Sequence, residues 1–531
     1  MSTTSPSAPV SPRSGGPWSA FSPTGSAVPL LVLLLLGVLL RLPSLAAPPL
    51  DSHHVRQADT ASIARNMLRH GVDLLGPRID WAGPEAGTVE SEFPLYASGV
   101  ALLWKLTGVT YVFDYRLPRL LSIAGWLLGG IALFRWVRRR LRGPPWLYLI
   151  LYTLSPLAIV FSRNIQPDAL AVGLLLLALE RADACDEQGR AGLGSAALSV
   201  VLGALAVACK GTLAFHALLI PALIVARSRR LFWALGAGLV LIVLPAFWYW
   251  HAHFVLGAEG ATFGIWGSKA HKWGSLAVWL DPMTWRAILG AFIVQTVSPI
   301  GVVLVILGAR RAVGQPEMGP FALALVLGLV AAVTVAEGFR LHNYYQLMLV
   351  PFCSVLVGLG ISDLLERLRA PALERRVRLA ALATLAGVVL LSLLWGLSFV
   401  RSSLQLDDRI AMVSLGVQAV LPRNRSVIAV DVHPQSLLYS VDRRGWHRTR
   451  MDAREVRRLQ GLGAEYFLVT NTSSTASDER VLGYLQVAGD PVAHGPGWSL
   501  HRLKSAPPVA PRRKATPPPE PKPGAVVPSS P

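Results

Sequence analysis

The chain has 531 residues, of which 52% are hydrophobic and only 15% are charged. Soluble globular proteins carry about 25% charged residues, so this composition excludes an ordinary soluble protein and predicts a polytopic membrane protein. The formal net charge of +19 does not indicate nucleic-acid binding, because much of the arginine lies in short loops between apolar runs, where it sets membrane topology. The three cysteines, Cys185, Cys209 and Cys353, lie in or beside apolar runs and predict neither disulfides nor a zinc site.

The N-terminal end differs from the apolar middle of the chain. Residues 1–27 are rich in Ser, Pro and Gly with the single charge of Arg13, and they predict a disordered cytoplasmic tail. The apolar run 28–46 follows this long and weakly basic segment. It therefore predicts an uncleaved signal anchor instead of a cleaved signal peptide.

A membrane-spanning helix needs about 20 mostly apolar residues. About eleven segments meet or approach this requirement, and they are 28–46, 118–136, 145–162, 167–182, 194–209, 211–227, 231–250, 286–308, 319–337, 343–364 and 379–400. The run 95–108 is too short to span and predicts a re-entrant or interfacial helix.

Basic residues follow every second predicted span. These are Arg135, Arg138, Arg139, Arg140 and Arg142, then Arg227, Arg229 and Arg230, then Arg310 and Arg311, and finally Arg367, Arg369, Arg375, Arg376 and Arg378. Excess Lys and Arg in short loops marks the cytoplasmic side. The N-terminus is then cytoplasmic, whereas the loops 47–117, 251–285 and 337–343 are extracytoplasmic.

The composition changes after the last predicted span. Residues 401–505 are mixed and charged, with short apolar strand patterns at 426–432 and 466–470 and a helical pattern at 453–462 between them. This order predicts a small extracytoplasmic α/β domain. Residues 506–531 are rich in Pro and Lys and predict a disordered tail.

The richest polar stretch runs from Asp51 to Thr60, directly after the first span. Asp51 is placed to act as a general base or to cap the following helix, and spacing alone leaves both open. His53 and His54 are adjacent, without the i,i+4 spacing of a helical metal pair, so we expect them to hydrogen-bond. Asp59 is either a helix cap, a partner of Arg56 or a second acid.

The sequence that follows predicts an amphipathic helix. Ile63, Ala64, Met67 and Leu68 form an apolar stripe within 60–69, and we expect this helix to lie on the membrane surface.

The outer loops hold further candidate binding residues. Glu90 and Glu92 precede an apolar run. Carboxylates at the edge of a bilayer are costly unless they bind a ligand or form a pair, which indicates a binding role. The alternative is that they stabilise the start of the following helix through its macrodipole. Asp80 stands beside Trp81, as in a sugar platform. Arg163, Lys210 and Arg340 are candidate phosphate contacts, and for Lys210 snorkelling is the alternative. The segment with His342, Tyr344, Tyr345 and Gln346 suggests contacts with phosphate or sugar hydroxyls, although interfacial Tyr is common by default.

Taken together, these motifs resemble those of the polytopic GT-C glycosyltransferases, and of glycosyltransferase family 39, which includes protein O-mannosyltransferases and lipid A aminoarabinose transferases. The motifs are Leu50-Asp51-Ser52-His53-His54, Arg56-Gln57-Ala58-Asp59-Thr60-Ala61-Ser62-Ile63-Ala64-Arg65-Asn66-Met67, Glu90-Ser91-Glu92-Phe93-Pro94-Leu95-Tyr96 and His342-Asn343-Tyr344-Tyr345-Gln346-Leu347. The resemblance covers most of residues 28–400 and implies an all-α GT-C membrane module.

The chain departs from the family pattern at two places. Members carry Asp-Glu in the first outer loop, with the Asp as base, whereas here Asp51 is followed by Ser52. A second register sets Arg56-Gln57 opposite Asp-Glu and leaves Asp59 as the nearby acid. A Glu-Lys-Pro of the aminoarabinose transferases corresponds to Glu92-Phe93-Pro94, so the phosphate contact has to come from Arg56, Arg163, Lys210 or Arg340.

The resemblance implies transfer of a sugar from a polyprenyl-phosphate donor to a protein, lipid or glycan acceptor on the outer face of the plasma membrane. A bacterial source fits the Arg-, Ala-, Leu- and Pro-rich composition. We take Asp51 as the first candidate base and Asp59 as the second, with no metal ligand set and a divalent cation left open. The alternatives are a flippase of lipid-linked glycans and a polysaccharide polymerase or ligase. A flippase places ionisable groups near the bilayer midplane, which these spans lack.

Overall fold

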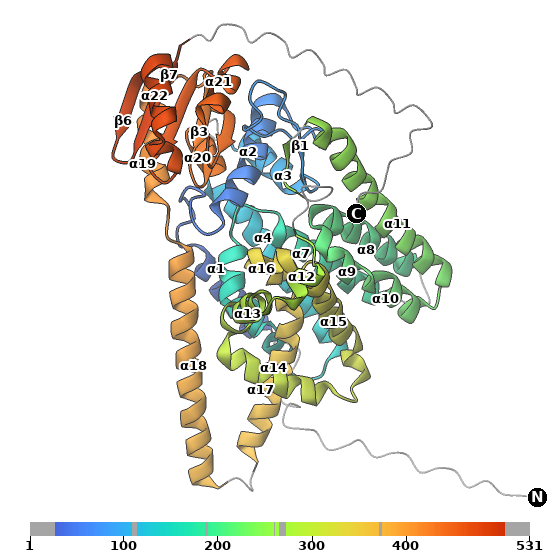
Figure 1. Ribbon diagram of the computed structural model, residues 1–531. Coiled ribbons are helices and arrows are strands. Elements are labelled where there is room, and N and C mark those ends of the chain that lie inside the picture. Colours follow the sequence, from blue (N-terminus) through green and yellow to red (C-terminus); the bar gives the residue numbers. More distant parts are fainter. Residues whose placement is uncertain are drawn as a thin grey trace, which may run out of the picture.

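The computed structural model describes residues 27–108, 114–185, 190–259, 261–264, 272–370 and 374–504. The described chain forms a bundle of helices with a small α/β domain at one end (Figure 1). The predicted tails 1–27 and 506–531 lie outside the described residues, apart from Ala27.

The helices of the bundle follow the predicted apolar segments. They are α1 (Ala27–Arg41), α4 (Arg116–Arg140), α5 (Ile150–Leu154), α6 (Pro156–Phe161), α7 (Asp168–Asp183), α8 (Arg190–Cys209), α9 (Ala214–Ala217), α10 (Leu219–Ser228), α11 (Leu231–His251), α12 (Leu276–Leu280), α13 (Pro282–Ala291), α14 (Ser298–Ala312), α15 (Gly319–Thr334), α16 (Ala336–Leu341), α17 (Val350–Arg369) and α18 (Arg375–Ser403). In the described chain, six helices are long and apolar enough to cross a membrane, or seven if one bent pair is a single span. The protein is thus a multi-pass membrane protein, and the count of eleven spans is not confirmed.

The predicted span 286–308 is bent. The helical stretches 282–296 and 298–312 meet there at an angle of 94°. The break lies at Ser298, whose φ of 65° is left-handed, directly before Pro299. A proline disfavours the α-helical region for the residue before it, and this local signal outweighs the apolar composition.

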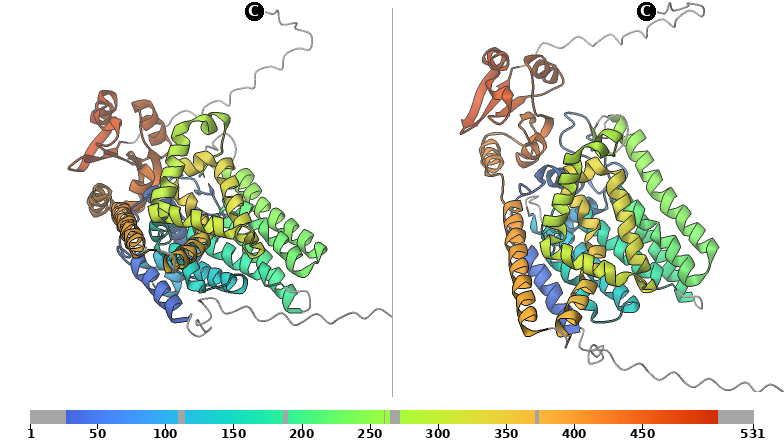
Figure 2. Two further views of the ribbon diagram at one scale, coloured as in Figure 1. Left: turned by 90° about the horizontal axis from the view of Figure 1, so that it is seen from below. Right: turned by 60° about the horizontal axis from the view of Figure 1, so that its bottom comes forward.

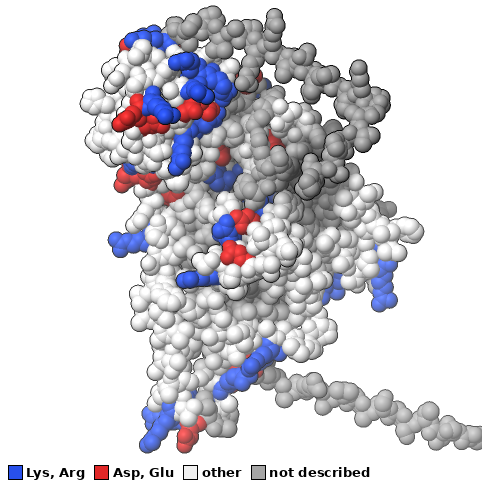
Figure 3. Space-filling view, in the orientation of Figure 1, with Lys and Arg blue, Asp and Glu red and all other residues white. Residues whose placement is uncertain are grey.

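The basic ends of the bundle helices gather at the end remote from the α/β domain. Arg140 of α4 and Arg227 of α10 both pair with the buried Asp183 of α7. Arg311 of α14 pairs with Glu366 of α17. Figure 3 shows a mostly uncharged surface between the charged groups at the bottom of the bundle and those around its middle, below the domain. This is the pattern that a bilayer requires of the surface it surrounds.

The first outer loop forms a layer between the bundle and the domain. It contains α2 (His54–His70), α3 (Leu95–Leu106) and β1 (Val89–Glu90), which pairs in parallel with β2 (Ala261–Thr262) of the second outer loop. The predicted helix 60–69 is present as part of α2, but its placement on the membrane surface is wrong. Residues 57–67 are all buried, because α3 packs against α2 on one side and the α/β domain on another.

The C-terminal domain has the predicted α/β order. After α19 (Asp408–Val420), the sheet contains β3 (Ser426–Val430), β4 (Arg444–Arg448), β5 (Tyr466–Thr470), β6 (Gly489–Gly495) and β7 (Trp498–Leu503), in the order β4-β3-β5-β7-β6. β3 is parallel to β4 and β5, whereas β7 is antiparallel to β5 and β6. The accompanying helices are α20 (Pro434–Ser440), α21 (Ala453–Gly461) and α22 (Glu479–Ala488).

Buried ion pairs connect this domain to the first outer loop. Arg65 of α2 reaches Asp80 at 2.5 Å and Asp442 of the domain at 3.0 Å. Arg69 pairs with the same Asp442 at 2.8 Å. Figures 1 and 2 show α18 at the side of the bundle, leading into the domain that lies over α2. The carboxyl end of β3 and the start of α20 therefore face the outer loops of the bundle.

Candidate active site

A polar cavity of about 710 Å³ lies between the bundle and the C-terminal domain. Four regions that are distant in sequence line it: the first outer loop, residues 262–264 with Lys272, residues 342–345, and the C-terminal domain. The lining residues are His53, His54, Val55, Arg56, Asp59, Trp81, Glu92, Thr262, Phe263, Gly264, Lys272, His342, Tyr344, Tyr345, His433, Gln435 and His447. The loops therefore converge on a single site at the end of the bundle nearest the C-terminal domain.

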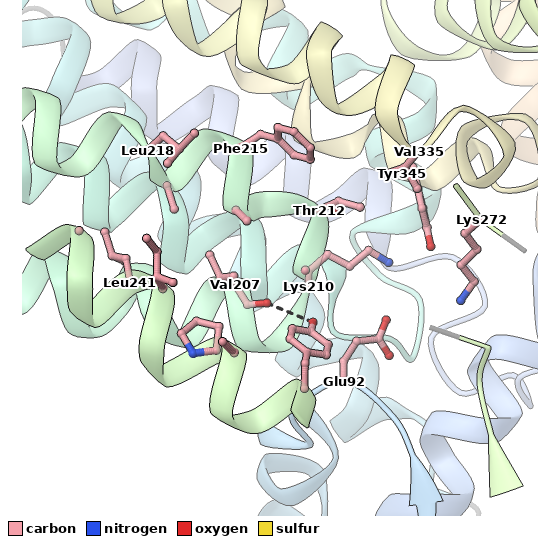
Figure 4. A pocket seen from close by; sticks show the side chains of 18 of the residues that line it. Glu92, Val207, Lys210, Thr212, Phe215, Leu218, Leu241, Lys272, Val335 and Tyr345 are labelled. Atoms are coloured by element: carbon pink, nitrogen blue, oxygen red, sulfur yellow. Dashed lines mark hydrogen bonds between the residues drawn. The ribbon is translucent and has the colours of Figure 1, made fainter. Parts of the chain in front are cut away.

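A second, apolar groove of about 430 Å³ runs along the bundle and meets this cavity. α11 and the segment 210–221, which contains α9, supply most of its walls, including Leu218, Leu241 and Pro245. Figure 4 shows these apolar side chains along the groove and the polar groups of Glu92, Lys210, Tyr345 and Lys272 together at one end. The two spaces share three lining residues, which are Glu92, Lys272 and Tyr345. A single molecule with a long apolar tail and a polar head therefore fits the two spaces, with the tail in the groove and the head in the cavity.

Three cations stand where the spaces join. Arg56 binds Glu92 at 2.5 Å, and Lys210 binds the buried Asp168 at 2.9 Å. The Lys210 ammonium also lies 4.3 Å from the ring centre of Tyr345, within the range of a cation–π contact. Lys272 donates to the carbonyl oxygen of Phe263 at 3.1 Å.

The charges at this junction shift one another's pKa values. Burial alone raises the pKa of Glu92, but the charges of Arg56, Lys210 and Lys272 outweigh it and hold the pKa at about 2. Burial lowers the pKa of Lys272 to about 8, with Glu92 acting in the opposite direction. Glu92 is therefore an anion that keeps Arg56 in place, and Lys272 is a cation held close to its titration point.

Asp59 is the acid that lines the cavity between Arg56 and Trp81. Its carboxylate accepts a hydrogen bond from Trp81 Nε1 at 3.0 Å. Burial raises the pKa of Asp59 to about 7, although the Trp81 hydrogen bond and the charge of Arg56 both lower it. A carboxylate with this pKa is suited to accept a proton near neutral pH. Asp59 lies in the second turn of α2, so the prediction that it caps this helix is wrong.

Asp51 lies outside the cavity and is held by basic residues. Its carboxylate pairs with Arg119 at 3.2 Å and with Arg163 at 3.4 Å, and it accepts a hydrogen bond from Gln57 at 2.5 Å. It is buried at 2% exposure and lines a second recess together with Ser403, and this recess shares His54 with the cavity. α2 begins without a side-chain cap, so the capping alternative for Asp51 is also wrong.

Burial favours the neutral form of three histidines of the cavity, His53, His54 and His342. His53 Nε2 donates to Asn343 Oδ1 at 2.9 Å, and burial lowers the pKa of His53. Burial, followed by the charge of His53, lowers the pKa of His342 to about 3. His54 shares a hydrogen bond of 2.8 Å with Ser436 of the C-terminal domain, and burial lowers its pKa to about 4.

The comparisons with known proteins can now be set beside this geometry. No protein-family model and no curated protein sequence matches the chain. In structure, it is similar to ArnT from Cupriavidus metallidurans bound to undecaprenyl phosphate, with a TM-score of 0.60, 14% identity and coverage of 91% of this chain and 98% of ArnT. The oligosaccharyltransferase AglB from Archaeoglobus fulgidus, in complex with an inhibitory peptide and a dolichol-phosphate, is similar with a TM-score of 0.53, 10% identity and coverage of 88% and 72%. The chain has the GT-C fold. At these identities the likeness establishes the fold alone, and it confirms the fold that the sequence motifs predict.

Eight of the predicted site residues line the polar cavity of this GT-C protein, and a ninth lines the groove. The eight are His53, His54, Arg56, Asp59, Glu92, His342, Tyr344 and Tyr345, and the ninth is Lys210. Arg56 and Lys210 both stand at the junction, as expected of phosphate contacts.

Other predicted residues line neither space and support the site from outside. Gln57 donates to Asp51 and accepts from the backbone N–H of Ile165 at 3.0 Å. Asp80 is enclosed by Arg65, Ser62 and Asn66, so the expected sugar platform of Asp80 and Trp81 does not form, although Trp81 itself faces the cavity.

The remaining predicted residues are also engaged elsewhere. Glu90 accepts from Thr262 and lies 3.2 Å from His253, which ties the first outer loop to the second. Arg163 donates to the carbonyl oxygen of Ser44 at 2.9 Å in addition to its Asp51 pair. Arg340 pairs with Glu337 on the surface, and Gln346 is buried between Thr296 and the carbonyl oxygen of Ile288.

Sequence reasoning missed His433, Gln435 and His447, which the C-terminal domain contributes to the cavity. They follow or belong to β3 and β4, and side chains beyond the carboxyl ends of parallel strands often form binding sites. The predicted β-α-β order thus contained a signal for His433 and Gln435. No sequence signal showed that the carboxyl end of β3 faces the helix bundle.

The described residues contain no group of three or more His, Cys, Asp or Glu side chains placed to hold a metal ion.

Proposed function

We propose that this protein is a membrane glycosyltransferase that moves a sugar from a polyprenyl-phosphate donor to an acceptor on the extracytoplasmic face of a plasma membrane. The observation that carries the proposal is the meeting of the apolar groove with the cation-lined polar cavity. Two proteins with the same fold bind lipid phosphates. ArnT is bound to undecaprenyl phosphate, and AglB is in complex with a dolichol-phosphate. The predicted orientation, with basic loops in the cytoplasm, puts the cavity outside.

The polyprenyl tail of the donor lies in the groove between α9 and α11. Its phosphate then lies at the junction, where Arg56, Lys210 and Lys272 neutralise its charge. The sugar extends into the polar cavity. These contacts grow stronger as the phosphate leaves and gains charge, so they stabilise the transition state more than the ground state.

Asp59 is the general base in this proposal. The acceptor hydroxyl attacks the anomeric carbon, the bond from this carbon to the phosphate oxygen breaks, and the polyprenyl phosphate leaves with the bonding electrons. The proton of the hydroxyl moves to Asp59. We move this role from Asp51 to Asp59 because Asp59 lines the cavity and Asp51 is enclosed by Arg119 and Arg163.

The matched pair Asp59→Asn and Asp51→Asn tests the assignment. Purified protein is supplied with radiolabelled polyprenyl-phosphate mannose, glucose and arabinose, and release of polyprenyl phosphate and transfer of label are measured. General-base catalysis contributes 100-fold or more, so Asp59→Asn is expected to lower turnover by at least about 100-fold. Asp51→Asn is expected to lower turnover per folded molecule by less than about tenfold. The carboxylate of Asp51 fixes the start of the first outer loop through Arg119 and Arg163 and does not contact the substrate in this proposal. Loss of turnover in Asp51→Asn alone would return the role of base to Asp51.

A further inference from the structure

Contacts divide the cavity lining into two groups of different character. The first group is the charged junction with Arg56, Glu92, Lys210 and Lys272, already described. The second group is the roof, which we define as His54, Trp81, His433, Gln435 and His447. Trp81 meets the ring of His447 at 4.6 Å, and His54 meets the ring of His433 at 4.5 Å. Asp59 belongs to both groups, through Arg56 and Trp81.

The roof lacks permanently charged cations. None of its five residues is a lysine or an arginine. Burial lowers the pKa of His447 to about 4, as it does for His54, so both imidazoles are neutral at pH 7. A phosphorylated or sulfated acceptor would be desolvated here without a cation to pair with, which is costly.

The hydrogen-bonding groups of the roof are of mixed type. A neutral imidazole has one donor and one acceptor nitrogen, and the amide of Gln435 has both kinds of atom. A hydroxyl group both donates and accepts, whereas a phosphate dianion only accepts. Trp81 adds an aromatic ring with an apolar surface beside these polar groups. Mixed donors and acceptors around an aromatic ring suit a ring of hydroxyl-bearing carbons.

The strand edge beside the roof is not open to a peptide. β4 is an edge strand of the sheet, and an extended peptide could in principle add to such an edge. However, Gly445 of β4 already accepts from Gly83 N–H at 2.6 Å and donates to the carbonyl oxygen of Asp80 at 3.0 Å. The carbonyl oxygen of His447 accepts from Arg448 at 2.8 Å.

We infer that the roof is the acceptor subsite and that the acceptor is an uncharged, polyhydroxylated sugar, presented by a glycan or a glycolipid. This inference rests on the proposed glycosyltransferase function. It places the acceptor hydroxyl beside Asp59, on the side away from the donor phosphate. The C-terminal domain thereby selects the acceptor, whereas the membrane bundle binds the donor.

The test offers three acceptor probes to the full-length protein in lipid nanodiscs with the same labelled polyprenyl-phosphate sugars. The probes are octyl mannoside with octyl glucoside, lipid A, and a threonine-containing peptide. Label is expected on the octyl glycosides. Transfer to lipid A phosphate or to the peptide, without transfer to either glycoside, would overturn the inference while leaving the glycosyltransferase intact. If no probe releases polyprenyl phosphate from any donor, both proposals fail.

Two variants of the roof refine the test. Gln435→Leu and His447→Phe replace hydrogen-bonding side chains with apolar side chains of similar size. Each is expected to raise the KM of the glycoside about tenfold and to change the KM of the donor by less than about twofold. The matched controls are Gln486→Leu and His494→Phe, which alter exposed positions of the same domain. An unchanged glycoside KM in both roof variants would contradict the assignment.

Discussion

At the scale of single residues, the account depends on two neighbouring groups with opposite titration behaviour. Asp59 has a pKa of about 7, above its ordinary value of 3.8, because it is buried. Lys272 has a pKa of about 8, below its ordinary value of 10.5, for the same reason. The base form of Asp59 and the charged form of Lys272 coexist only in a narrow range of pH.

We therefore expect a bell-shaped pH profile of kcat/KM for the donor, with its acid limb near pH 7 and its alkaline limb near pH 8. The acid limb follows ionisation of Asp59, and the alkaline limb follows loss of charge from Lys272. Lys272→Arg is expected to remove the alkaline limb, because arginine stays charged. An unchanged alkaline limb in this variant would exclude Lys272 as its source.

Asp59 also links function to stability. Because the folded protein raises its pKa, the folded state binds this proton more tightly than the unfolded state, and ionisation costs stability as the pH rises from about 3.8 to about 7. Asp59→Asn is expected to raise the thermal unfolding midpoint at pH 8 and to leave it unchanged at pH 4. Equal shifts of the unfolding midpoint at pH 8 and pH 4 would show that ionisation of Asp59 does not destabilise the folded protein.

At the scale of elements, the groove between α9 and α11 is expected to select the donor by its tail. Ala246 of α11 lines this groove, whereas Val243 of the same helix is 49% exposed and does not. Ala246→Trp fills the groove and is expected to raise the KM of an undecaprenyl-phosphate donor about tenfold, with a smaller effect on a donor with a geranyl chain.

Val243→Trp is the control for this prediction, because it adds the same side chain to the same helix outside the groove. Similar effects of the two substitutions on the long-chain donor would mean that the tail lies elsewhere.

The elements also show what sequence can and cannot predict. Helices such as α4, α8 and α15 were predictable because an apolar run is a local property. The burial of α2 was not, because α20, which covers it, follows more than 360 residues later. Spacing alone could not separate Asp51 from Asp59, since their different surroundings come from Arg119, Arg163 and Trp81 in other segments.

At the scale of the whole molecule, the junction of domain and bundle determines the shape of the cavity. Asp442 supports this junction, because it pairs with Arg65 and Arg69 while it is itself buried. Asp442→Asn keeps the left-handed backbone that residue 442 adopts (φ 55°), which Asn tolerates. Removing one partner of a buried pair is expected to destabilise the protein by about 3 kcal/mol and to lower the unfolding midpoint.

Asp490→Asn is the control, since Asp490 forms an exposed pair with Lys504 and is expected to change stability by less than about 0.5 kcal/mol. Equal midpoints for the two variants would show that the Asp442 pairs do not hold the domain in place.

The central claim is that a polyprenyl phosphate binds across the groove and the cavity. A cryo-electron microscopy structure of the full-length protein in nanodiscs with undecaprenyl phosphate tests it most directly. We expect the tail between α9 and α11 and the phosphate within hydrogen-bonding distance of Lys210, Lys272 or Arg56. A tail elsewhere on the bundle, or a phosphate that contacts none of these cations, would contradict the account.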